Sequence, residues 1–288
     1  MSAYQETYPV PHGGRPPDPP ELPAGTDPAP QWPAWYAPAG FLAGFAITLF
    51  VSVIAGAIAA AFGADIADEI PPALVVVLTL AQAVILTGTA IFLAGRTRKP
   101  RPWHFGLQRA PFWRSVGWAA AGLGSFFVFA ILYSVLVAPE GDQTVTEDLG
   151  ADESTLALVA AGIVVIVVAP MAEEFFFRGF FYRALRSRMG LLSAAAIDGL
   201  VFGLIHYTGP DTLELLPVLG ALGFMFCLVY ERTGTLYTVI ALHSFNNAIA
   251  YGVEAETATV SLVLGALMLT GCALGPRFFH RRRATAYT

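Results

Sequence analysis

The chain has 288 residues, of which 56% are hydrophobic and only 13% are charged. Its mean hydropathy of +0.61 excludes an ordinary soluble protein and is typical of an integral membrane protein. The formal net charge of −5 is small for this length, so the placement of the charges along the chain is more informative than their sum.

Residues 1–38 are rich in proline, glycine and acidic side chains and show no helical periodicity. This composition predicts a flexible, partly polyproline II-like tail. A ligand for a proline-binding partner is the alternative, but a solvated linker explains the composition without one. Trp32, Trp35 and Tyr36 at the end of the tail are expected at the membrane–water interface, where aromatic side chains gather.

Eight apolar stretches follow within residues 39–276. About 20 helical residues cross a hydrocarbon core of about 30 Å, and continuous apolar runs favour helices over the alternating strands of a β-barrel. We therefore expect an all-α, polytopic transmembrane bundle of about eight helices, in which the fifth and seventh are weakest by length and polarity. The expected spans are Ala39–Phe62, Pro71–Gly95, Trp113–Val137, Leu156–Leu185, Leu191–His206, Leu213–Tyr230, Thr235–Tyr251 and Val260–Leu274.

Basic and acidic residues lie in alternate connections between these spans. The connection between the second and third spans has no acidic residue, and the segments RALRSR and RFFHRRR are also basic. By the positive-inside rule this side is cytoplasmic, which places both termini, including a basic tail over residues 277–288, in the cytoplasm. The basic residues of the second connection are Arg96, Arg98, Lys99, Arg101, Arg109 and Arg114.

Two further features of the sequence limit the possible partners and processing. The first apolar stretch begins near Ala39 and is too long for a signal-peptide core, so no cleavable leader is expected. The segment KPRPWHFGLQRAPFWRS mixes basic and aromatic residues, which a membrane surface explains better than nucleic acid does. We expect a lipid bilayer and no nucleic acid among the partners.

The stretch MAEEFFFRGF, residues 171–180, places Glu173, Glu174 and Arg178 in the fourth span. One ionisable residue at this depth costs roughly 2.5–3.5 kcal/mol, so the three cannot all face lipid. Glu174 and Arg178 are four residues apart in the favourable order for an ion pair, whereas Glu173 points about 100° away. Pro170 is expected to bend this helix and to open room for water.

Two histidines, His206 and His243, lie in or at the edge of apolar spans. In FGLIH, Phe202 lies one turn before His206, and in HSFNN, Asn247 lies one turn after His243. A single buried histidine is more often interhelical packing than a site, but two histidines, an asparagine and an unpaired carboxylate on three helices are hard to explain by packing. A structural ion pair that fixes helix packing remains the alternative for the two glutamates and the arginine.

This set of side chains suits hydrolysis within a membrane. A glutamate in an apolar pocket can take a proton from water and return it to a leaving amine. Histidine can orient that water, bind a metal or donate to developing charge. The amide of Asn247 can donate to an oxyanion.

Three other polar or thiol side chains lie within the spans. Asp198 lies eight residues before His206 and about 80° around the helix, so it could support the site or contact solvent near the cytoplasmic end, and we slightly favour solvent. Cys227 and Cys272 form no CxxC pattern and are expected to be small core residues, without a disulfide or thiolate metal site.

EEFFFR, FGLIH and HSFNN resemble the EExxxR, FxxxH and HxxxN motifs of the CPBP family, which includes CaaX prenyl endopeptidases and bacteriocin-processing or Abi-type membrane proteins. The resemblance covers residues 156–251 and implies a protease that uses glutamate-activated water. It implies that Glu173 is the general base, that Glu174 and Arg178 support the site, that His206 and His243 hold water or a metal, and that Asn247 stabilises the oxyanion.

The resemblance also leaves alternatives open. The family is often called a metalloprotease family, so Glu173, His206 and His243 could be ligands of an open zinc site, in which case Glu174 would be the base; no cofactor is certain. The implied substrate is a membrane-associated peptide or protein, such as a prenylated CaaX-like tail or a leader peptide, and the commonest setting is a bacterial plasma membrane. A proton-coupled transporter or a non-proteolytic immunity or scaffold protein could use the same buried polar cluster.

Overall fold

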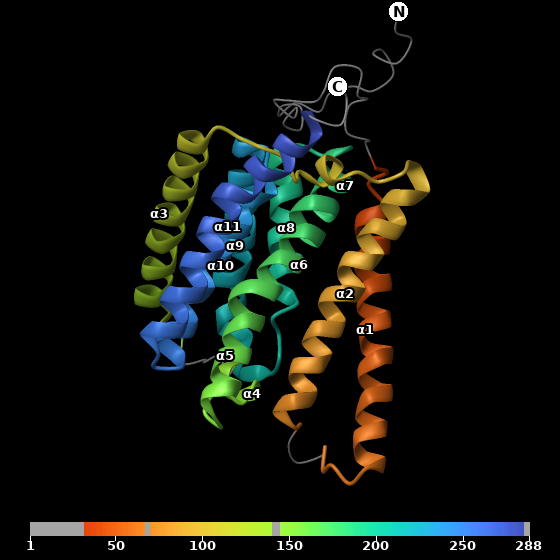
Figure 1. Ribbon diagram of the computed structural model, residues 1–288, viewed down its shortest axis with the longest axis vertical. Coiled ribbons are helices and arrows are strands. Elements are labelled where there is room, and N and C mark those ends of the chain that lie inside the picture. Colours follow the sequence, from red (N-terminus) through yellow and green to blue (C-terminus); the bar gives the residue numbers. More distant parts are fainter. Residues whose placement is uncertain (1–31, 67–69, 140–144, 285–288) are drawn as a thin grey trace, which may run out of the picture.

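The computed structural model describes residues 32–66, 70–139 and 145–284, and over these residues it is helical and has no β-strand (Figure 1). The predicted all-α transmembrane bundle is confirmed. Residues 1–31 of the predicted tail and residues 285–288 of the predicted basic tail lie outside the described residues. The last helix continues to residue 284, past the predicted start of the basic tail at residue 277.

All eight predicted stretches are helical. Six segments of the described chain are long and apolar enough to cross a membrane, and the fifth and seventh stretches fall short of that standard. The elements are α1 (Tyr36–Ala61), α2 (Pro72–Thr97), η1 (Pro102–Phe105), α3 (Phe112–Val137), α4 (Val145–Asp148), α5 (Thr155–Ile163), η2 (Val164–Val168), α6 (Ala169–Phe176), η3 (Phe177–Phe181), α7 (Tyr182–Arg186), α8 (Leu191–Leu204), η4 (Pro210–Leu215), α9 (Leu216–Thr233), α10 (Leu236–Glu254) and α11 (Ala258–Ala284).

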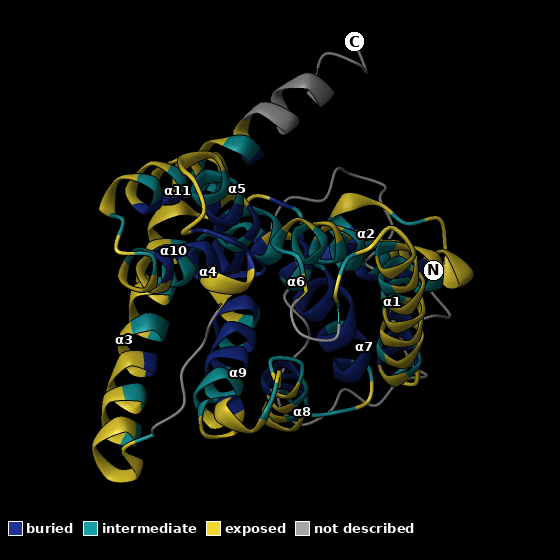
Figure 2. Ribbon diagram, turned by 90° about the horizontal axis from the view of Figure 1, so that it is seen from below, coloured by how far each residue is buried: buried dark blue, intermediate teal, exposed yellow. Residues whose placement is uncertain are grey.

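The helices surround a buried centre made by the fourth span together with α8, α9 and α10. Figure 2 shows exposed residues along the outer helices α1 and α3, and buried residues on α6, α7 and α9. The exposed side chains of α1 and α3 are largely apolar, as lipid surroundings require. The chain is therefore an integral membrane protein whose polar groups are collected in the interior.

Aromatic side chains fill the end of the bundle at which the described chain begins and ends, which we call the basic end because it carries the loop between α2 and α3. Phe105 of η1 stacks on Phe175 with 4.5 Å between ring centroids. Trp32 packs 5.1 Å from Phe105 and 5.4 Å from Phe180. The ring of Trp32 is buried in this cluster, whereas Trp35 is exposed.

The loop that follows η1 is fastened to the start of α10. The Gln108 amide donates to the Gly234 carbonyl (2.6 Å), and the Thr235 hydroxyl donates to the Gln108 carbonyl (2.6 Å). Gly106 has φ +85°, and its carbonyl accepts from the Leu236 backbone N–H at 2.8 Å. These contacts satisfy buried backbone groups and close the basic end over the interior.

Helices α8 and α9 pack backbone to backbone through glycines. A Cβ on Gly199 would lie 2.6 Å from the Gly220 carbonyl oxygen, and one on Gly203 would lie 2.8 Å from the Leu216 carbonyl oxygen. Gly199 and Gly203 are four residues apart, which is the small-residue spacing that lets membrane helices approach closely. This contact fixes the position of α8, which carries Asp198 and Phe202.

We expect Gly199→Ala to lower the thermal unfolding temperature of the purified protein, because the added methyl meets backbone atoms that cannot move aside. The matched control is Gly124→Ala in α3, where an added Cβ has no neighbour within 4 Å. Alanine is the better helix former by about 1 kcal/mol, so the control should be neutral or more stable. Equal unfolding temperatures of the two variants would contradict the close contact between α8 and α9.

His104 in η1 should stay neutral at mildly acidic pH. Its Nδ1 accepts the Arg101 backbone N–H (3.1 Å), and burial, with the charges of Arg183, Arg98 and Arg101, lowers its pKa from 6.5 to about 4. The unfolded chain binds a proton at this ring near pH 6.5. The stability contributed by the neutral ring is therefore full above pH 6.5 and is lost as the pH falls toward 4.

Ring nitrogen chemical shifts of isotope-labelled protein test this expectation for His104. A titration midpoint near 6.5 would contradict it. Thermal unfolding gives a second measurement, because His104→Gln should lose less stability than the wild type between pH 7 and pH 5.

Candidate active site

Four segments bring the predicted polar residues together in the interior. Helix α6 carries the two glutamates, η3 carries Arg178, α10 carries His243 and Asn247, and the turn after α8 carries His206. The predicted fifth span ended at His206, but α8 ends at Leu204, so His206 sits on a turn.

The local geometry of α6 begins with Pro170. A proline has no N–H to donate, and the Ala169 N–H bonds to the carbonyl of Val164, five residues back, in a π-turn. The Val165 carbonyl is thereby left without an N–H in its own helix, and the Asn247 side-chain amide donates to it at 3.0 Å. The predicted bend at Pro170 is thus a widened turn that binds α10.

A second π-turn, η3, follows α6 directly. It ends with the Tyr182 N–H bonded to the Phe177 carbonyl. The eight residues of α6 therefore lie between two widened turns. Such turns are rare and occur often at functional sites, because they change which side chains face a neighbouring helix.

Arg178 is the cation at the centre of the site and is 0% exposed. Its Nη1 donates to Glu174 Oε1 (2.9 Å), and its Nη2 donates to the carbonyl of Gly223 on α9 (2.9 Å). The guanidinium also lies 4.5 Å from the ring centroid of Phe202 and 5.1 Å from that of Phe226. The predicted pair of Glu174 and Arg178 is confirmed, and cation–π contacts add to it.

Asp198 is the second counter-ion of Arg178. Its Oδ1 lies 3.5 Å from Arg178 Nε and accepts a hydrogen bond from Cys227 Sγ at 3.1 Å. Both Asp198 and Arg178 are 0% exposed, so the predicted solvent contact of Asp198 is wrong. Cys227 is fully buried as predicted, and it also donates to this carboxylate.

His243 links the paired glutamate to the unpaired one. Its Nδ1 lies 2.8 Å from Glu174 Oε1, and its Nε2 lies 4.0 Å from Glu173 Oε2. The carboxylate of Glu174 can only accept, so Nδ1 carries the proton, and Nε2 of the neutral ring presents a lone pair toward Glu173. Glu173 is 16% exposed, and its Oε2 makes no hydrogen bond to the described residues.

His206 has the same proton arrangement as His243. Its Nδ1 lies 2.7 Å from the Phe202 carbonyl oxygen, which can only accept, so this nitrogen carries the proton. The Phe202 ring lies 4.9 Å from the His206 ring and 5.8 Å from the His243 ring, measured between centroids. The predicted stacking of Phe202 on His206 is confirmed, and Phe202 contacts both histidines.

The side chains of Glu173, His206 and His243 are of the types that bind metals, but they do not lie close enough together to share one metal ion. Both histidines have Nδ1 engaged, which leaves Nε2 as an acceptor, the arrangement common for metal-bound histidine. However, the described residues contain no group of three or more His, Cys, Asp or Glu side chains that could hold a metal ion, and this applies to the conditional set of Glu173, His206 and His243.

The burial of Asp198 gives a testable expectation. Asp198→Ala removes an acceptor from Arg178 and Cys227, and it should lower the free energy of unfolding by about 1–3 kcal/mol. The matched control is Asp211→Ala on exposed η4, which should stay within about 0.5 kcal/mol of the wild type. Denaturant unfolding of the purified protein is the measurement, and similar values for both variants would contradict the assigned role of Asp198.

Comparisons with known proteins match the part of the chain that carries these residues. Residues 155–249, which hold all three polar motifs, match the family model described as "Type II CAAX prenyl endopeptidase Rce1-like". The chain is 27% identical over 171 residues to the "Putative membrane peptidase YdiL" of Bacillus subtilis (strain 168), and this match covers 54% of the chain and 66% of the length of that relative. No solved structure matches the chain significantly. Over residues 155–249 the chain is therefore similar to the Rce1-like CAAX prenyl endopeptidases, and it is similar to one membrane peptidase over a longer stretch.

Proposed function

We propose that the protein is an intramembrane endopeptidase that hydrolyses a peptide bond of a membrane-associated substrate by glutamate-activated water. One observation carries the proposal. Glu174 is held by Arg178 and His243, whereas Glu173, one residue earlier, has no ion-pair partner closer than 4.0 Å among the residues that the structure describes. Adjacent carboxylates in such different surroundings are suited to separate roles, one in positioning and one in proton transfer.

Glu173 is the general base in this proposal, and His243 Nε2 orients the water through its lone pair. Glu173 takes one proton from water as the water oxygen attacks the carbonyl carbon of the scissile bond. The carbon–nitrogen bond then breaks, and Glu173 returns the proton to the leaving amine. His243 Nε2 accepts the second hydrogen of the water, and His206 Nε2, whose proton also lies on Nδ1, offers an alternative acceptor for that hydrogen, in line with its expected water-binding role.

Asn247 is the proposed donor to the oxyanion. One of its two amide hydrogens is used by the Val165 carbonyl, and this bond fixes the orientation of the amide group. The other amide hydrogen can donate to developing negative charge on the substrate oxygen. Asn247 would therefore act both in holding η2 against α10 and in stabilising the intermediate.

Glu174, Arg178 and Asp198 position the reacting groups in this proposal. Glu174 sets the proton on His243 Nδ1 and so keeps Nε2 free for water. Arg178 holds Glu174, and it is held in turn by Asp198 and the Gly223 carbonyl. This chain of contacts joins α6, η3, α8, α9 and α10, so Glu173, His243 and Asn247 sit on packed helices, whereas His206 sits on a turn.

The substrate class follows from the family and the membrane location. A peptide or protein that reaches the bilayer, such as a prenylated CaaX-like tail or a leader peptide, fits both. The basic end would face the cytoplasm by the positive-inside rule, with both termini on that side. A bacterial plasma membrane is the proposed setting.

Glu173→Gln should lower cleavage by at least about 100-fold, because the amide cannot take the proton from water. Terminal proteomics of membrane proteins from cells with wild-type or variant protein would identify the substrate and measure the loss. Glu153→Gln, at an exposed glutamate, is the matched control and should cleave normally. Normal cleavage by Glu173→Gln, with normal membrane insertion, would disprove the general-base role.

A further inference from the structure

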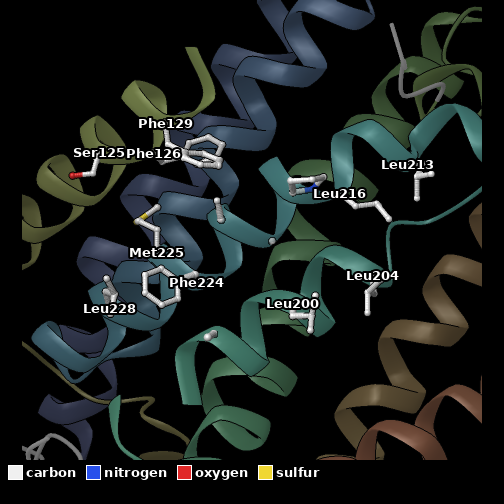
Figure 3. Close-up of a pocket in the computed structure, with 14 residues that line it drawn as sticks. Ser125, Phe126, Phe129, Leu200, Leu204, Leu213, Leu216, Phe224, Met225 and Leu228 are labelled. Atoms are coloured by element: carbon white, nitrogen blue, oxygen red, sulfur yellow. The ribbon is translucent and has the colours of Figure 1, made fainter. Parts of the chain in front are cut away.

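An apolar groove of about 800 Å³ lies between α3, α8 and α9, away from the polar site. Figure 3 shows its lining, in which side chains of α3 face those of α8 and α9. Ser125 is the polar exception, and its hydroxyl donates to the Ala121 carbonyl of its own helix at 2.8 Å. The groove thus offers a ligand hydrocarbon surface without a free hydrogen-bonding side chain among its lining residues.

Two contacts of α3 separate this groove from the rest of the molecule. On the side of the basic end, a Cβ on Gly122 would lie 2.5 Å from Met225 Sδ and Val229 Cγ2, which marks the closest approach of α3 to α9. On the opposite side, the Tyr133 hydroxyl donates to the Glu214 carbonyl at 2.7 Å. Between these contacts the helices stand apart, and the groove opens toward the lipid.

Beyond the Gly122 contact, nearer the basic end, α9 and α3 carry a cationic and aromatic pair. Arg232 lies one turn after the lining residue Leu228, on the same face of α9. Its guanidinium carbon is 5.0 Å from the ring centroid of Trp118, which lies about two turns before Ser125 on α3. Arg114 is one turn before Trp118 on the same face. Tryptophan and arginine together are typical of the level of lipid headgroups.

The positive charge of Arg232 is not cancelled by its neighbour in the sequence. The Glu231 carboxylate forms an ion pair with Arg186 at 2.6 Å and accepts a hydrogen bond from the Tyr182 hydroxyl at 2.9 Å. Its charge is therefore balanced by Arg186 rather than by Arg232. Arg232 and Arg114 are both exposed. They can therefore meet an external anion.

We propose that the groove, Arg232, Arg114 and Trp118 form a binding site for one anionic phospholipid. The phosphate lies at the two arginines, and one acyl chain runs along α9 into the groove. Half of a hydrocarbon core is about 15 Å, which equals about ten helical residues. From Arg232 this length reaches the level of Leu222 and passes the lining residues Leu228 and Phe224. The site does not depend on the proposed protease activity.

Native mass spectrometry of the full chain, released from detergent micelles, tests this site. The probes are phosphatidylglycerol and phosphatidylcholine with identical acyl chains. We expect one retained phosphatidylglycerol and about fivefold weaker retention after Arg232→Gln, the factor that one arginine near a membrane surface supplies. Arg96→Gln removes an exposed arginine at the end of α2 and should leave retention unchanged.

A second pair of variants tests the place of the acyl chain. Ala221→Phe fills the groove from α9 and should reduce retention of both lipids, whereas Ala57→Phe on the exposed face of α1 should not. The thermal unfolding temperature of each variant checks that it is folded. If Ala221→Phe does not fold, the lipid site is tested by Arg232→Gln alone.

Equal retention of the two lipids by the wild type, or equal effects of Arg232→Gln and Arg96→Gln, would overturn the headgroup assignment. Full retention in a folded Ala221→Phe variant would overturn the groove assignment. Displacement of phosphatidylglycerol by an added isoprenoid chain at equal concentration would show that the groove takes a substrate tail instead, and it would also overturn the proposal.

Discussion

The structure depends on one oxygen atom, Oε1 of Glu174, which binds Arg178 at 2.9 Å and His243 at 2.8 Å. An isolated charge in this interior would be costly, and removing one partner of a buried pair leaves an uncompensated charge. Glu174 balances the charge of Arg178 together with Asp198, and it also binds Nδ1 of His243. Helices α6 and α10 are therefore held in one relative position by an electrostatic requirement as well as by packing.

The surroundings of Arg178 show how the bilayer interior accepts this charge. Two carboxylates, the Gly223 carbonyl and three aromatic rings surround the guanidinium. Close packing of α8 on α9 through Gly199 and Gly203 brings Asp198 and the Gly223 carbonyl within reach from two different helices. The close glycine packing is thus needed for the buried charge, because it brings the polar partners of Arg178 near to the guanidinium.

Much of this arrangement could be predicted from the sequence, because it depends on local spacing. Hydrophobic length predicts the helices, and the four-residue spacing predicts the pair of Glu174 and Arg178. The partner of Asp198 could not be predicted in the same way, since its contact joins two different helices, for which no fixed sequence spacing exists, and Arg178 already had a local partner. The burial of Trp32 likewise depends on the loop that carries Phe105. A useful signal for Asp198 was its position in the middle of an apolar helix, where solvent is a poor explanation of a carboxylate.

The π-turn at Pro170 has a consequence for how this helix can change in evolution. A widened turn corresponds to one extra residue relative to a regular α-helix. Loss of one residue from VVIVV would restore regular turns and rotate the preceding part of the span by about 100° relative to α6. The Val165 carbonyl would then no longer meet Asn247. An insertion or deletion in this segment should therefore break this contact unless a second length change compensates for it.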